Sequence, residues 1–98
     1  MNSAHILCIG KDSGILRSRV AVLQSGGYHA TSVMFVDADN VLQREAFDLL
    51  ILSVILTGEE RDHIAAIVAG STPILQVTKT FLASELLADV GQRLRRQT

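Results

Sequence analysis

The residues that could do chemistry in this chain of 98 residues are concentrated in four short segments, each of which follows an apolar run. These segments are Gly10–Gly14, Phe35–Asp39, Ser53–Glu60 and Thr78–Phe81. Ser53 carries a hydroxyl group, but a serine is a weak nucleophile without a base beside it, and the sequence shows none. Asp12 is of the type that caps a helix or binds a cation, and Lys79 is of the type that binds an anion or pairs with Asp12. The four segments therefore hold polar groups that can bind, but no activated serine.

A second kind of chemistry rests on Cys8, which precedes the glycine-containing segment Gly10–Gly14. A thiolate at such a place can accept a phosphoryl group, which backbone N–H groups and a helix N-terminus would hold. Ile9 follows Cys8, so the cysteine is expected one or two residues too deep in a strand, which is more typical of a buried and inert thiol. The glycines fit a nucleotide-binding loop poorly, because their spacing is too short for a Walker loop and lacks the Rossmann pattern.

Glycines and a single proline divide the chain into segments that predict alternating strands and helices. Short, nearly continuous apolar runs predict strands covered on both faces, at His5–Ile9, Tyr28–Val36, Phe47–Leu52 and Thr72–Thr78. Apolar residues at helical spacing predict helices between Asp12 and Gly26, from Ala38 to Glu45, between Thr57 and Gly70, and from Leu82 to Arg96. The expected helix caps are Asp12 or Ser13, Asp37, and Thr57, which forms a capping box with Glu60.

The expected order of elements is a strand followed by a helix, four times over. Such alternation predicts a parallel sheet with right-handed crossovers and helices on both faces, which is a three-layer α/β/α fold. Residues 1–98 show no linker, repeat or low-complexity segment, so we expect a single domain. Sites in such sheets form beyond the carboxyl ends of the strands, where the four polar segments are expected to meet.

Composition and charge exclude several classes of protein. Hydrophobic residues make up 48% of the chain and charged residues 19%, which is typical of a folded domain. The formal net charge of −1 gives no basic excess for nucleic acid, and no apolar run reaches the roughly 20 residues of a membrane span. The lone cysteine excludes an intrachain disulfide, and the three histidines lack metal-ligand spacing. With no signal-peptide pattern at the N-terminus, we expect a cytoplasmic domain with no metal, cofactor, nucleic-acid partner or membrane contact.

Four sequence segments, taken in order, resemble the receiver domain of response regulators, the CheY-like domains. They are Ile6–Asp12, Leu23–Tyr28, Phe47–Ser53 and Val77–Phe81. Phe47–Ser53 is similar to the family's Phe-Asp-Leu-Val-Ile-Leu-Asp strand, and Val77–Phe81 is similar to its Val-x-Lys-Pro-Phe segment. The resemblance spans nearly the whole chain. It implies a flavodoxin/CheY-like fold and a place in bacterial two-component signalling and phosphorelay.

The residues at the family's active-site positions depart from its pattern. Ser53 stands where the resemblance places the phosphoacceptor aspartate, and Gly10 and Lys11 stand where it places two metal-holding acids. Asp12 is the only acid that remains, one place further along. Phosphoryl transfer to a carboxylate needs a divalent cation on oxygen ligands, whereas Lys11 brings a positive charge to the place of that cation. The departures imply a degenerate receiver that has no catalytic residue, is not an enzyme and is not phosphorylated.

The interval after the acceptor position is also shorter than in the family. Ser53 and Lys79 are 26 positions apart, which leaves room for one helix and one strand where a full receiver has two of each. We therefore expect a four-stranded sheet that lacks one strand–helix unit. Thr78 and Lys79 are the remaining receiver-like switch and anion-binding positions, although a full receiver holds the corresponding residues on two different strands.

These expectations make the chain a pseudo-receiver, which is a signalling module that binds another protein without accepting a phosphoryl group. The expected partner is a kinase, a regulator or a second copy of the chain in a homodimer. The first and last helices are the expected contact surfaces, with Leu16, Val22 and Val90 as candidate apolar residues. The alternative is a small phosphocarrier with Cys8 as acceptor, because size and element order are similar to the cysteine-bearing B subunits of sugar phosphotransferase systems.

Overall fold

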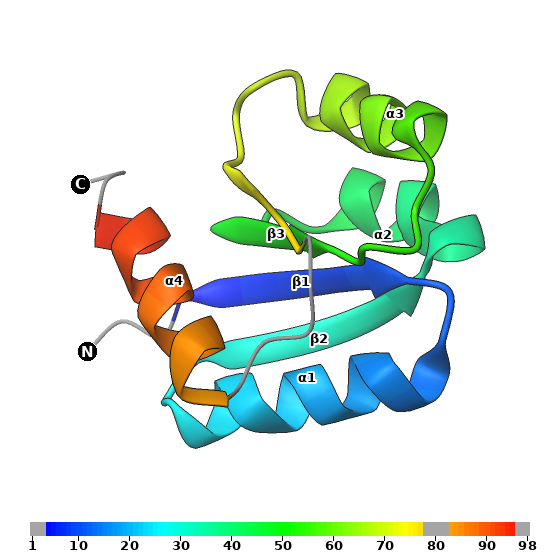
Figure 1. The fold of residues 1–98 in the computed structure, drawn as a ribbon. Coiled ribbons are helices and arrows are strands. Elements are labelled where there is room, and N and C mark those ends of the chain that lie inside the picture. Colours follow the sequence, from blue (N-terminus) through cyan, green and yellow to red (C-terminus); the bar gives the residue numbers. More distant parts are fainter. Residues whose placement is uncertain (1–3, 78–82, 96–98) are drawn as a thin grey trace.

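The computed structural model describes residues 4–77 and 83–95 of the chain. Within these residues, strands and helices alternate along the chain as expected (Figure 1). The strands are β1 (His5–Gly10), β2 (His29–Met34), β3 (Leu49–Leu52) and β4 (Ile74–Gln76). The helices are α1 (Ser13–Ser25), α2 (Ala38–Arg44), α3 (Gly58–Val68) and α4 (Ala83–Arg95), with a short 3₁₀ helix, η1 (Phe35–Asp37), after β2.

The four strands form one parallel sheet in the order β2-β1-β3-β4. Flavodoxin-like folds have the order 2-1-3-4-5, so this sheet has their order up to the fourth strand. Helices α1 and α4 cover one face of the sheet, and α2 and α3 cover the other (Figure 1). The predicted three-layer α/β/α fold with a four-stranded parallel sheet is therefore confirmed for the described part of the chain.

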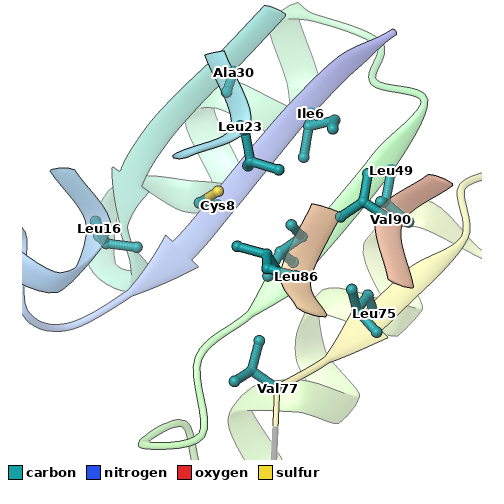
Figure 2. Close-up of a cluster of buried hydrophobic side chains, with 11 residues drawn as sticks. Ile6, Cys8, Leu16, Leu23, Ala30, Leu49, Leu75, Val77, Leu86 and Val90 are labelled. Atoms are coloured by element: carbon teal, nitrogen blue, oxygen red, sulfur yellow. The ribbon is translucent and has the colours of Figure 1, made fainter. Parts of the chain in front are cut away.

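The two central strands, β1 after His5 and β3, consist of buried residues without polar side chains, because helices cover both faces of the sheet. Successive residues of a strand point to opposite faces. Ile6 and Leu49 lie in the cluster beneath α1 and α4 (Figure 2), and Leu7 and Leu50 lie in the cluster beneath α2 and α3. All four side chains are completely buried. Side chains of the paired strands β1 and β3 therefore lie at the centre of the core on both faces of the sheet.

The last helix, α4, packs its apolar stripe on the sheet. Leu86 and Val90 are buried in the cluster beneath α1 and α4, and Leu87 and Leu94 pack against it. These four residues recur at helical spacing and face the sheet, while Leu82, the predicted start of this helix, lies outside the described residues. Neither α4 nor any other helix in the described part is long and apolar enough to cross a membrane.

Two helices begin at the predicted caps, and both begin at the carboxyl edge of the sheet. Asp12 Oδ1 accepts a hydrogen bond from the N–H of Ile15 at 3.0 Å, which caps α1. Thr57 Oγ1 accepts from the N–H of Glu60 at 3.1 Å, and Glu60 Oε1 accepts from the N–H of Thr57 at 2.8 Å. The capping box of α3 is therefore complete, and these bonds hold both helix starts in place.

Strand ends differ from the prediction because a strand extends only where a neighbour pairs with it. β2 ends at Met34 rather than Val36, since its partner β1 ends at Gly10. The chain then turns into η1, so Asp37 lies in helical conformation instead of capping α2 with its side chain. β4 is three residues long, since it pairs only with residues 50–52 of β3. The predicted end of this strand, Thr78, lies outside the described residues.

Candidate functional site

The loops that follow β1 and β3 lie together at the carboxyl edge of the sheet, because the two strands are neighbours (Figure 1). The first loop follows Gly10, the last residue of β1, and the second starts at Ser53. The N–H of Ser53 donates to the carbonyl of Ile9 at 3.0 Å, so pairing continues up to the start of the second loop. The other two predicted site residues, Thr78 and Lys79, lie outside the described residues.

Ser53 is bound into its own turn. Its side chain is buried, with 5% of the residue exposed. Its Oγ accepts a hydrogen bond from the N–H of Ile55 at 3.4 Å. Its carbonyl accepts from the N–H of Leu56 at 3.2 Å and from Nε2 of Gln76 at 3.4 Å. Ser53 therefore closes the turn after β3 and presents little of its hydroxyl group to solvent.

Gly10 is packed so closely that its position has little room for a side chain. A Cβ atom on Gly10 would lie 3.1 Å from Cβ of Ser53 and 3.2 Å from Cδ2 of Leu16. Both distances are shorter than the roughly 3.5–4.0 Å at which carbon atoms make favourable contact. A side chain at this position would require the side chains of Ser53 and Leu16 to shift by a few tenths of an ångström.

Lys11 forms an ion pair with Glu60 across the two loops, with Nζ and Oε1 2.8 Å apart. The hydrogen bond from Lys11 lowers the pKa of Glu60, and the bond from the N–H of Thr57 lowers that pKa further. Sequence reasoning placed Glu60 in the capping box and in the segment Ser53–Glu60, but did not pair it with Lys11. Opposite charges in a loop and in a helix far apart in the chain do not identify their own partners, so only the fold identifies this contact.

Acidic side chains at this edge do not gather into a cation site. Asp12 is exposed, and its Oδ1 is engaged as the cap of α1. Glu60 is engaged by Lys11 and by its own helix start. Within residues 4–77 and 83–95, no group of three or more His, Cys, Asp or Glu side chains is placed to hold a metal ion. The described polar contacts at this edge are the helix caps, the Lys11–Glu60 ion pair and the contact of His63 Nε2 with the Asp39 carboxylate at 3.0 Å.

Cys8 is completely buried in β1, beneath α1 (Figure 2). Burial raises the pKa of its thiol from 9.0 to about 12, although the charge of Arg19 acts in the opposite direction. The phosphocarrier interpretation needs an exposed thiol that ionises readily. The structure contradicts that requirement, because a thiol in the middle of a covered strand has neither solvent access nor a ready thiolate.

The Cys8 thiol should react with a disulfide reagent at pH 8 about a thousandfold more slowly in the folded chain than in urea, since its raised pKa lowers the thiolate fraction by about that factor. The measurement is the release of a coloured thiol, and the unfolded chain is the control. Because the folded pKa is the higher one, the folded chain should also lose stability as the pH rises from about 9 towards about 12. Rapid reaction in native buffer would contradict the buried position.

The candidate contact residues on the first and last helices are not exposed, so they do not form the predicted contact surfaces. Leu16 and Val90 are buried and Val22 is partly buried, because the apolar stripes of α1 and α4 face the sheet. Among the described residues, one exposed large apolar side chain lies in the first turn of α1, and the other three follow β2 and β3. They are Ile15, Val36, Val54 and Ile55, with exposed fractions between 51% and 83%. Sequence reasoning missed Val36 because it assigned this residue to a strand, and it did not name Ile15, Val54 or Ile55 as candidates.

No family model matches the sequence, and no curated protein matches it. Solved structures do match. The BeF3-activated DrrB receiver domain has a TM-score of 0.72 and 21% identity, over 96% of this chain and 99% of that chain. The chemotaxis response regulator CheY4 of Vibrio cholerae has a TM-score of 0.75 and 21% identity, over 95% and 99%. A CheY-like response regulator receiver domain protein from Methanospirillum hungatei JF-1 has a TM-score of 0.71 and 15% identity, over 98% and 97%.

These three structures are receiver domains, and each is matched over nearly its whole length. The resemblance drawn from four short sequence segments is therefore confirmed at the level of the fold. Identities of 15% to 21% establish the shared fold and leave the chemistry to this chain's own residues.

Proposed function

Because the chain has the CheY-like receiver fold, we propose that it is a signalling module that binds another protein and is not itself phosphorylated. The observation that carries this proposal is the state of Ser53. It is buried, and its Oγ accepts a hydrogen bond from the N–H of Ile55. A serine hydroxyl needs a base to become a nucleophile, and a backbone N–H cannot take its proton.

The charges beside Ser53 also support a role without phosphorylation. Phosphoryl transfer to a carboxylate at the receiver acceptor position needs a divalent cation on oxygen ligands. Gly10 offers no ligand atom on a side chain, and Lys11 offers an ammonium group that already neutralises Glu60. We propose that this edge is a fixed surface for contact and that the chain is not an enzyme.

The proposed partner is a protein of a signalling pathway in the cytoplasm, which is a kinase, a regulator or a second copy of this chain. Val36, Val54 and Ile55 are more than half exposed near this edge. Exposed apolar side chains gain free energy when a partner covers them. These residues therefore replace those of the first and last helices as candidates for the contact.

Treatment with acetyl phosphate, or with beryllofluoride and Mg²⁺, should leave the domain unchanged, because the nucleophile and the cation ligands are missing. Intact-mass analysis should find no adduct, and two-dimensional NMR should find no shifts at the amides of Asp12, Ser53 and Glu60. A phosphoryl adduct on Ser53, or Mg²⁺-dependent shifts around it, would overturn the proposal. An adduct on Cys8 would assign the chain to the phosphocarriers instead.

The matched variant for this test is Ser53→Asp, which restores a carboxylate at the acceptor position and leaves Gly10 and Lys11 as they are. We expect this variant also to remain free of beryllofluoride, because the cation that would stabilise the adduct still lacks its acidic ligands. Uptake of beryllofluoride by Ser53→Asp would show that Gly10 and Lys11 do not prevent cation binding at this edge.

A further inference from the structure

We propose that the Lys11–Glu60 ion pair is an internal clamp, which holds the loop after β1 against the first turn of α3. With this clamp, the carboxyl edge of the sheet keeps one arrangement without a bound cation or phosphoryl group. The inference rests on the proposed role without phosphorylation. In it, Lys11 and Glu60 fix the carboxyl edge of the sheet. Lys11 and Glu60 are positioning residues in this account.

The acidic half of the clamp is held by the helix start. Glu60 Oε1 accepts from the N–H of Thr57 at 2.8 Å, and the N–H of Glu60 donates to Thr57 Oγ1 at 3.1 Å. The Glu60 side chain is 20% exposed. The Glu60 carboxylate cannot move into solvent without breaking the capping box, so Lys11 binds a carboxylate that is held in one position.

The basic half of the clamp depends on that carboxylate. The N-terminus of an α-helix carries a partial positive charge, which disfavours a cation beside it. Lys11 nevertheless approaches the first turn of α3, where its Nζ lies 2.8 Å from Glu60 Oε1. Arg61, the next residue of α3, is engaged elsewhere, since its Nη1 donates to the carbonyl of Leu56 at 2.7 Å. Loss of the Glu60 charge should therefore release Lys11.

This pair differs from an ordinary surface ion pair. Pairs between two flexible, exposed side chains contribute little, because both side chains lose conformational freedom. In the clamp the capping box already holds the Glu60 side chain, so only Lys11, which is 40% exposed, loses conformational freedom when the pair forms. The hydrogen bond from Lys11 is the largest cause of the lowered pKa of Glu60. The pair is therefore intact at neutral pH and is lost as the pH falls below 4.5, through the lowered value.

Two variants separate the clamp from the helix cap. Glu60→Gln removes the charge but keeps a side chain that suits the capping box. Lys11→Met removes the ammonium group and keeps an unbranched apolar chain, and Lys11→Arg keeps the charge. We expect Lys11→Met and Glu60→Gln to move the same amide signals in both loops and to speed their hydrogen exchange about two- to fivefold.

The pattern across the variants decides the proposal. The double variant should change the amide signals and the hydrogen exchange no more than either single variant does. Lys11→Arg should behave like the parent. Lys11→Met should raise the pKa of Glu60. The clamp is refuted if Glu60→Gln leaves the loop after β1 unmoved, or if the pKa of Glu60 stays low in Lys11→Met. These measurements need neither Mg²⁺ nor beryllofluoride, so their failure is distinct from failure of the proposed function.

Discussion

Replacing Gly10 with aspartate should destabilise the domain by about 3 to 5 kcal/mol instead of rebuilding a cation site. The new Cβ would lie 3.1 Å from Cβ of Ser53 and 3.2 Å from Cδ2 of Leu16, both of which are buried. The carboxylate would also be placed in a buried position, where a charge without a partner is costly. The measurement is urea unfolding, followed with and without Mg²⁺.

Gly10→Ala is the control for this variant, because it adds the Cβ without the carboxylate. We expect it to cost about 1 to 3 kcal/mol through the close contacts alone. The difference between the two variants then reports the burial of the charge. A Gly10→Asp variant that is as stable as the parent, or that Mg²⁺ stabilises, would show that the edge still accommodates a cation.

Replacing Leu50 with alanine should remove about 3 to 4 kcal/mol from the free energy of unfolding. Leu50 is the second residue of β3, lies between β1 and β4 in the sheet, and is completely buried beneath α2 and α3. The loss combines the missing burial of apolar surface with the cavity that remains. Domains of this size are stable by only about 5 to 15 kcal/mol, so the urea midpoint should fall substantially.

Val36→Ala is the matched control for Leu50→Ala, because it also shortens an aliphatic side chain. Val36 is 83% exposed in η1, and its replacement should change the free energy of unfolding by less than about 0.5 kcal/mol. Equal losses in the two variants would contradict the assignment of Leu50 to the core and Val36 to the surface.

The alternation of strands and helices could be predicted because its signals are local. Residues 47–52 are apolar at nearly every position, which indicates a strand covered on both faces, and β3 is the fully buried strand beside β1. Asp12 and Thr57 have the residue type and spacing to bond N–H groups three residues further on. These caps need no information from the rest of the chain, so their prediction succeeded.

Strand ends and exposed surfaces could not be predicted in the same way. Val36 belongs to an apolar run, but β2 has no pairing partner beyond Met34. The chain therefore continues as η1, in which the Val36 side chain is exposed to solvent. Leu16 and Val90 were named as apolar residues to check for exposure, and they are core residues because the apolar stripes of α1 and α4 face the sheet. The end of β2 depends on pairing with a neighbouring strand, which a linear pattern does not contain.

The amino-acid sequence by itself determined the class of fold, two helix caps and the absence of acids at Gly10 and Lys11, because these depend on residue type and local spacing. Only the tertiary structure decided that Gly10 lies against Ser53 and that Lys11 meets Glu60. Each of these contacts joins segments far apart in the chain. Their approach is set by the pairing of β1 with β3, which places the two loops side by side at one edge of the sheet.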